Sequence, residues 1–351
     1  MAAQAGGQGL DHRLADGLGG LGAVHAPAPG QGGVGPHPGR YRQPGIDLGQ
    51  GQRQGEEGGE AARPLAGAPP LVLDLGVRVD PEARALRRAE RLYFQKRRVA
   101  AGRIFSRYQS PEARIGAAFS DWPNMSLAKL ERLALERRRD SLVLLHLGFA
   151  NFWAGHSAEA TTAWREAAEA QPDSASAQRA DDWLYPNFPP GQPFFVPTFG
   201  PPAGLGDLAP PAQLAALARE ARRRDAHAKL LYGLALQRLG HRLSARRQYD
   251  AAARLAPRDP EALVAAAVAR FDKRSPSGAF SRLGPLTRRF PKAPTVRFHL
   301  GVLLLWLART QPGSVEEGKR QLRLAQAEGP GSPLAMQAKR LLARLANAPK
   351  K

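Results

Sequence analysis

One spacing of small residues, aromatic residues and prolines recurs along this chain. Residues 141–174 and 226–259 show it in full, with identical intervals between successive members. The two sets are Gly148, Gly155, Ala160, Trp164, Ala167 and Pro172, and Gly233, Gly240, Ala245, Tyr249, Ala252 and Pro257. A fixed period in this range indicates repeated supersecondary units, so the repeat constrains the fold more than any other feature.

The spacing continues towards the C-terminus. Residues 260–293 carry Ala279 and end on Pro291, which lies 34 residues after Pro257. Residues 294–332 contain Gly301 and Pro330, with an insert of five residues around Gln311. Residues 333–346 are expected to form a terminal capping helix. A weaker unit with Ile115-Gly116 precedes the first full repeat.

Each residue type has a physical role if every unit is a pair of antiparallel helices. Small residues let the two helices approach, aromatic residues fill the space between pairs, and proline ends a pair because it cannot continue a helix. A single pair cannot bury its own apolar face, so the pairs must stack. The residues predicted to hold the repeat are Gly148, Ala160, Trp164, Pro172, Gly233, Ala245, Tyr249, Pro257, Pro291, Gly301 and Pro330.

The spacing resembles that of the tetratricopeptide-repeat (TPR) family, whose pattern is L-G-x2-Y, then A-x3-F, then P. The strong resemblance covers residues 141–174 and 226–332, and with the weaker units it spans about 82–346. It implies an all-α protein, an α-solenoid in which antiparallel helix pairs form a right-handed superhelix.

The domain prediction follows from composition. Residues 1–80 are expected to be a disordered, low-complexity segment and linker, because their first 70 residues are rich in Gly, Gln, Pro and Ala. Translation from a start codon further downstream is an alternative. Residues 81–346 form the predicted repeat domain, beginning after Asp80 as the helix cap, and residues 347–351 form a tail. Residues 176–184 and 211–224 are expected to be two helices of one unit, split by the proline- and aromatic-rich insert 185–203.

In the TPR family the first helix of each pair lines a concave groove that binds an extended segment or helix of a partner. The apolar candidates carried over to this chain are Leu145, Phe149, Phe152, Trp153, Leu230, Leu234, Val264, Val268, Phe271, Phe298, Val302 and Trp306. Polar candidates on the same faces include His227, Gln237 and Glu261. Chaperone-binding members use Lys, Asn and Arg where this chain has Leu145, Phe149, Leu230 and Leu234, so a carboxylate clamp is not expected.

An apolar groove on a protein surface is either covered by another segment or prone to bind other proteins and to aggregate. The insert holds Phe188, Phe194, Phe195 and Phe199 among many prolines, a composition typical of extended segments. One interpretation is that the insert lies on the groove of its own chain. The other is a loop whose phenylalanines only seal the interrupted repeat.

These features favour a scaffold or adaptor that binds an unidentified protein or peptide, without enzyme activity, cofactor or metal. The chain has no cysteine, and none of its eight histidines has metal-ligand spacing. His146 lies in an apolar run and is interpreted as a core residue. The longest apolar run, 300–308, is far shorter than the roughly 20 residues a membrane span needs. A cytoplasmic location is expected.

Binding of nucleic acid or another polyanion is the alternative function. The chain has a formal net charge of +20, although codon usage in a GC-rich genome would also enrich arginine. Tyr93, Phe94 and Tyr108 interleave with a set of basic residues. That set is Arg84, Arg87, Arg88, Arg91, Arg97, Arg98, Arg103 and Arg107.

Overall fold

A computed structural model describes residues 64–347 of the chain. This range contains helices, turns and irregular segments, and no strand. The all-α prediction is therefore confirmed for the described residues. The predictions of a disordered N-terminus and a C-terminal tail concern residues 1–63 and 348–351, which lie outside them.

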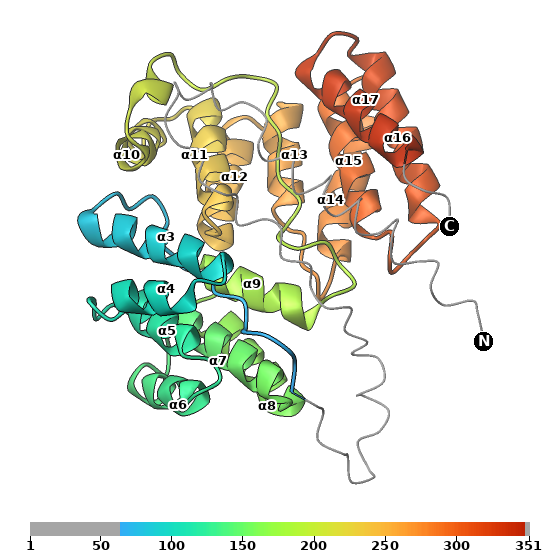
Figure 1. Ribbon diagram of the computed structural model, residues 1–351. Helices are drawn as coiled ribbons and strands as arrows, with labels where there is room; N and C mark the ends of the chain where they lie inside the picture. Colours follow the sequence, from blue (N-terminus) through green and yellow to red (C-terminus); the bar gives the residue numbers. More distant parts are fainter. Residues whose placement is uncertain (1–63, 348–351) are drawn as a thin grey trace, which may run out of the picture. The chain divides into compact units, whose positions relative to one another are not determined.

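The helices form two compact units that meet in the sequence between Leu184 and Tyr185, where one continuous repeat domain was predicted. The first unit contains α3 (Pro81–Phe94), α4 (Arg98–Phe105), α5 (Pro111–Ser120), α6 (Ser126–Glu136), α7 (Ser141–Ala154), α8 (Ser157–Ala170) and α9 (Ala175–Leu184). The second contains η2 (Leu205–Asp207), α10 (Pro210–Glu220), α11 (Ala226–Arg238), α12 (Arg242–Leu255), α13 (Pro260–Val268), α14 (Ser277–Arg289), α15 (Pro294–Trp306), α16 (Ser314–Glu328) and α17 (Pro333–Ala346) (Figure 1).

The repeats coincide with helix pairs. Residues 141–174 form α7 and α8, residues 226–259 form α11 and α12, and the next two units form α13–α14 and α15–α16 (Figure 1). The first helix of each pair packs along the second, and α17 packs on α16 as the predicted cap. This arrangement confirms an α-solenoid built from TPR-like helix pairs within the described chain.

Acidic and hydroxyl side chains start the helices where the sequence places them. The Asp80 carboxylate accepts a hydrogen bond from the Ala83 amide, as expected for the cap of α3. Asp140 and Asp225 cap α7 and α11 in the same way. Such side chains satisfy amides that have no partner within the helix, so each repeat begins at a defined residue.

Close approach of paired helices explains the repeated glycines. A Cβ added at Gly233 would lie 2.6 Å from Cε1 of Tyr249, and one added at Gly148 would overlap the Trp164 indole. Gly301 meets Leu322 of α16 at the equivalent place. The three glycines therefore occupy matching sites on α11, α7 and α15, and each allows the large side chain of the second helix to reach the backbone.

The four punctuating prolines also lie at matching places. Each follows the second helix of a pair by two residues, at Pro172, Pro257, Pro291 and Pro330. Proline cannot donate the backbone hydrogen bond that another helical turn would need, so each pair ends there.

The predicted split unit is wrong. Of its two proposed helices, α9 packs on α7 and α8 in the first unit, whereas α10 packs on α11 in the second. Both helices have the right length and period, but their partners are the neighbouring pairs. The insert between them therefore separates two compact units.

Each unit has an apolar core of its own, built on the inner faces of its helix pairs. Among residues 64–347, no helix is long and apolar enough to cross a membrane.

Candidate functional site: two grooves occupied by segments of the same chain

The predicted groove residues of the first unit lie on α7 and are shielded from solvent. Leu145 and Phe149 are fully buried, Trp153 is 4% exposed and Phe152 is half-buried. Part of the cover comes from α9, where the ring centroid of Trp183 lies 5.1 Å from that of Phe149.

The other eight predicted residues are all in the second unit, on α11, α13 and α15 except for Phe271, which lies in the turn after α13. None is more than 7% exposed. They are Leu230, Leu234, Val264, Val268, Phe271, Phe298, Val302 and Trp306. The structure therefore brings eight of the twelve predicted residues into one unit and places the other four in the other unit.

An irregular segment lies over the groove residues of the second unit. This segment, residues 185–199, is called the second strap and leads from α9 towards α10 (Figure 1). Phe195 is 1% exposed and belongs to the same core as Val264 and Phe298. Phe188 and Phe199 are half-buried and pack against that core. The aromatic insert thus covers the apolar face of α11, α13 and α15.

A buried histidine on α15 binds the backbone of the second strap. Nε2 of His299 lies 2.9 Å from the Val196 amide, and Nδ1 lies 2.7 Å from the Thr295 carbonyl. Because a carbonyl only accepts, Nδ1 carries the proton and Nε2 accepts the hydrogen bond from Val196. The Phe195 ring stacks on this imidazole, with centroids 5.4 Å apart.

Three further side chains bind strap backbone atoms from different elements. They come from α11, from α13 and from the segment after α15. Gln237 Nε2 donates to the Pro193 carbonyl at 2.9 Å, Glu261 Oε1 accepts from the Thr198 amide at 3.0 Å, and Arg309 donates to the Pro186 carbonyl at 2.9 Å. The groove therefore holds an irregular segment largely through its main chain.

The first unit holds a segment in the same manner. Residues 64–75, called the first strap, contain no helix or strand, and Leu71 and Leu75 are buried in the core of that unit. The Val72 amide donates to Nε2 of His146 at 3.1 Å. Nδ1 of His146 lies 2.7 Å from the Leu142 carbonyl, so this histidine has the same tautomer as His299.

Other contacts run along the whole first strap. The Leu65 amide donates to the Trp153 carbonyl at 3.0 Å, Tyr93 Oη donates to the Pro69 carbonyl at 2.6 Å, and the Leu73 amide lies 3.4 Å from Glu90 Oε1. Residues 71–80 were predicted to be a linker because no strand partner was evident. Their partners are instead side chains of α3 and α7.

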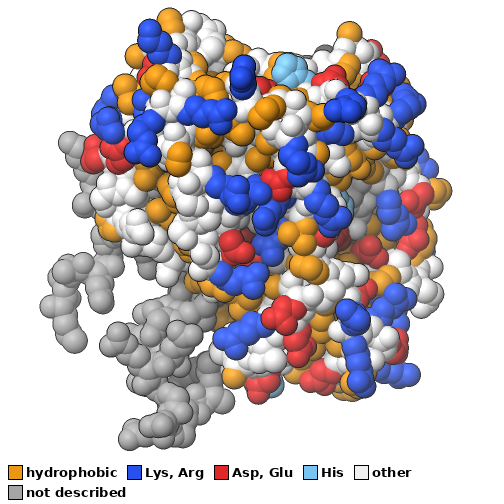
Figure 2. Space-filling view, turned by 180° about the vertical axis from the view of Figure 1, so that it is seen from behind, with side chains coloured by type: hydrophobic (Ala, Val, Ile, Leu, Met, Phe, Trp, Pro, Cys, Tyr) orange, Lys and Arg blue, Asp and Glu red, His pale blue; other side chains and the backbone are white. Residues whose placement is uncertain are grey.

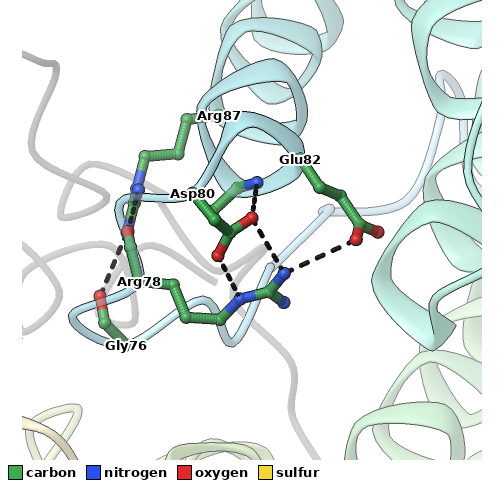
Figure 3. A network of polar contacts seen from close by, with 6 residues as sticks. Gly76, Arg78, Asp80, Glu82 and Arg87 are labelled. Atoms are coloured by element: carbon green, nitrogen blue, oxygen red, sulfur yellow. Dashed lines mark hydrogen bonds and ion pairs between the residues drawn. The ribbon is translucent and has the colours of Figure 1, made fainter.

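A polar network anchors the residues between the first strap and α3 (Figure 3). Arg87 donates to the carbonyls of Arg78 and Gly76, at 2.6 and 3.1 Å. Arg78 in turn binds the Asp80 carboxylate at 2.9 Å and approaches Glu82. The guanidinium of Arg78 lowers the pKa of Asp80 to about 2, so the cap of α3 stays ionised over the physiological range.

Burial sets the protonation of the strap-binding groups. It lowers the pKa of both His146 and His299 to about 4, because a charged imidazole would lose its hydration there. Burial raises the pKa of Glu90 and of Glu261. The hydrogen bonds that each carboxylate accepts from the straps lower the pKa, but by less. At neutral pH both histidines are uncharged, which leaves Nε2 free to accept.

The predicted basic surface is partly occupied by structural contacts. Arg87 binds the carbonyls described above, and Arg98 donates to the Trp122 carbonyl at 2.8 Å. Six of the eight arginines remain exposed: Arg84, Arg88, Arg91, Arg97, Arg103 and Arg107. Tyr93 is buried, whereas Phe94 is 44% exposed. Figure 2 shows Lys and Arg side chains spread over the face in view, with Asp and Glu between them.

Sequence reasoning correctly placed His146 in the core but missed its contact with the first strap, and it gave no role to His299. One signal could have linked them. Each histidine is followed by Leu-Gly and by a tryptophan seven positions later, at Trp153 and Trp306. Gln237 and Glu261 were expected on the groove face, and both contact the second strap there.

No family model and no curated protein sequence matches the chain. Among solved structures, the crystal structure of yeast Tom70 is similar at a TM-score of 0.26 and 14% sequence identity. The matched region covers 79% of this chain and 59% of that chain, so this chain spans less than two thirds of the length of Tom70. At this TM-score the fold class rests on the helix pairs described above.

Proposed function

We propose that this protein is a non-enzymatic scaffold that binds a segment of a partner protein in an apolar groove of its helix pairs. The observation that supports the proposal is the second strap itself. Its main chain is held by side chains of α11, α13 and α15 while Phe195 is buried among the groove residues. A groove that holds an irregular peptide segment of its own chain has the chemistry to hold one from another chain.

The second unit is the better candidate for exchange. Among the side chains of residues 186–199, only Gln192, Pro193 and Phe195 are buried, and segments containing proline and glycine flank them. Release of this strap requires no helix to unfold. The first strap, in contrast, leads directly into residues 76–80, which contacts of Arg87 and Arg78 fix next to α3.

A single labelled cysteine tests the proposal, because the chain has no other cysteine. Gly200 is exposed, and a Cβ there meets no atom within 4 Å, so Gly200→Cys should not disturb the fold. An environment-sensitive dye at this position is expected to respond when a captured partner binds. Gly313→Cys, in the same unit but next to the start of α16, is the matched control because Gly313 is exposed and its Cβ also meets nothing.

Elution provides the second measurement. A synthetic peptide of residues 186–199 should release the captured partner, and a scrambled peptide of the same composition should not. A partner that stays bound in excess strap peptide, with no change at position 200, would show that it binds elsewhere on the chain.

Polyanion binding through α3 and α4 remains a prediction, supported by the six exposed arginines and by the exposed Phe94 beside them. Arginine–phosphate contacts make affinity fall steeply as salt rises. Titration of a short single-stranded oligonucleotide at two salt concentrations tests it. Affinity that does not depend on salt would reject this alternative.

A further inference from the structure

The two straps present the same short pattern to two different grooves. In each, a proline carbonyl accepts a hydrogen bond from a side chain of the unit. Tyr93 donates to Pro69 at 2.6 Å in the first strap, and Gln237 donates to Pro193 at 2.9 Å in the second.

The match continues over the next three residues. The second residue after each proline is a large apolar side chain that is 1% exposed, Leu71 in one strap and Phe195 in the other. The third is a valine whose amide donates to a buried histidine, at 3.1 Å for Val72 and 2.9 Å for Val196. Each strap therefore presents one hydrogen-bond acceptor, one apolar side chain and one donor in the same order.

The helices that receive these contacts also match. The imidazoles of His146 and His299 are both fixed by a carbonyl four residues earlier, so both present Nε2 as an acceptor. A carboxylate then binds an amide after the valine, Glu90 with Leu73 and Glu261 with Thr198. Pro197 carries no amide hydrogen, which explains why the second strap uses the following residue.

We propose that the groove of the second unit selects partner segments of the pattern Pro-x-Leu/Phe-Val, bound in the register of Pro193–Val196 in place of the second strap. This inference rests on the proposed function and names the chemistry of its partner. Outside the pattern the aligned straps share only a glycine two residues before the proline, Gly67 in one and Gly191 in the other, both at φ 83°. The shared contacts therefore define what the groove recognises. One acceptor is unused, because Oε2 of Glu261 is buried without a hydrogen-bond partner in the described structure. A partner with an additional donor at the position of Thr198 gains a contact that the strap lacks.

The strap competes with any partner because it is tethered to the groove. A short flexible tether corresponds to an effective concentration of roughly millimolar, which weakens the apparent affinity of an added segment. The probe is a fluorescent peptide of residues 190–199, PGQPFFVPTF, titrated into the full-length protein. Phe195→Ala removes the buried anchor of the strap, and the peptide should bind this variant at least tenfold more tightly than the wild type. Phe194→Ala, at the half-buried neighbour, should change affinity little.

Modified peptides test the pattern one contact at a time. N-methylation of the valine amide removes the donor to His299 and should weaken binding roughly 5- to 10-fold. N-methylation at the preceding phenylalanine, equivalent to Phe195, is the matched control for backbone stiffness. Replacing that phenylalanine by alanine should weaken binding roughly 10- to 100-fold. A peptide of residues 66–75, which contains Pro-Pro-Leu-Val, should bind the same groove and compete with the probe.

The dye-labelled Gly200→Cys protein, with the strap otherwise unchanged, gives a second readout if Phe195→Ala fails to fold. Excess probe peptide should shift the dye signal, and the N-methyl-valine peptide should shift it less. Equal binding of the parent, N-methyl-valine and alanine peptides would overturn the pattern but leave groove binding, and hence the proposed function, intact. If no peptide binds or changes the dye signal, the pattern is also overturned. The proposed function would still stand if a captured partner shifts the dye signal.

The competing occupant of the groove is the second strap of another copy of this chain, exchanged between the two copies. This exchange predicts a dimer whose population rises with protein concentration, measured by light scattering after size-exclusion chromatography. A dimer that dissociates when Phe195 is replaced would assign the groove to a second copy and overturn the partner assignment.

Discussion

The imidazole of His299 accepts a hydrogen bond from the amide of Val196, a residue 103 positions earlier in the chain. The geometry requires a neutral imidazole, and burial supplies it by lowering the pKa of His299 to about 4. His146 and Val72 repeat the relationship across 74 positions. Two long-range contacts with the same chemistry thus fasten the straps, and they lead to measurable expectations.

Two substitutions of His299 should separate the stability contribution of its hydrogen-bond acceptor from that of the packing of its ring. In His299→Phe the Val196 amide loses its acceptor in a buried site, which should cost about 1–3 kcal/mol of unfolding free energy. His299→Gln places an amide oxygen near the position of Nε2 and should lose less. Urea denaturation monitored by circular dichroism measures both. Equal losses for the two variants would show that packing of the ring, and not its acceptor, is what matters.

Acidification should weaken the fold through both histidines. Their folded pKa, about 4, lies below the unfolded value of about 6.5, so the unfolded chain binds more protons as the pH falls between these values. Stability is therefore fully present above about pH 6.5 and is lost towards pH 4, on the order of 3 kcal/mol for each histidine. Glu90 and Glu261, whose pKa values are raised, act in the opposite direction.

The test of this prediction is the unfolding free energy of the wild type and of His299→Gln between pH 7.5 and 4. Glutamine does not titrate, so the variant should show a shallower decline. Parallel curves would mean that His299 is not the group responsible.

Replacing a glycine by alanine should change the stability of the chain according to how closely the neighbouring helix approaches that glycine. Gly233→Ala places Cβ against the Tyr249 ring and should destabilise the chain by about 1–3 kcal/mol. Gly284→Ala, in α14, has open space around its Cβ except for the ring of the next residue, Pro285, and should cost less, under about 1 kcal/mol. Thermal unfolding compares the two variants. A loss at position 284 as large as that at 233 would contradict the close approach of α11 and α12.

Removal of the charge on Glu261 should stabilise the protein near neutral pH. A raised pKa means that the folded state favours the protonated carboxyl, so its stabilising contribution is lost as the pH rises through the folded pKa. Glu261→Gln keeps an acceptor for Thr198 without a charge and should unfold at a higher temperature than the wild type at pH 8. Glu316→Gln is the control, because Lys319 lowers the pKa of that exposed carboxyl. A lower melting temperature for Glu261→Gln would show that the ionised form is the one the groove requires.

Local patterns predicted the helix pairs well, and their failure elsewhere has a physical cause. Gly148 and Trp164, or Gly233 and Tyr249, lie sixteen residues apart in one pair, so their spacing records direct contact between neighbouring helices. The straps have no such period. An irregular backbone that bonds to a distant side chain imposes little on its own sequence, so residues 71–75 resembled a linker.

The division into two units was hidden for a related reason. The lengths and apolar faces of α9 and α10 are compatible with one helix pair, and only contacts between different pairs assign them to separate cores. The candidate groove residues are apolar and largely shielded from solvent, and their role in binding a partner stays a prediction. In the second unit the apolar face is covered by the second strap. The composition of the insert was compatible with such a cover, but it could not distinguish a cover from a loop that only seals the interrupted repeat.

The position of each strap at the start of its unit has a consequence for synthesis. The ribosome delivers Phe195 and Val196 before α11, α13 or α15 exists, and His299 follows 103 residues later. At roughly 5–20 residues per second, this strap waits about 5 to 20 s for its site to be completed. Its aromatic side chains are available to chaperones during that interval, because the earliest segment of the nascent unit completes its native contacts only after α15 has been made.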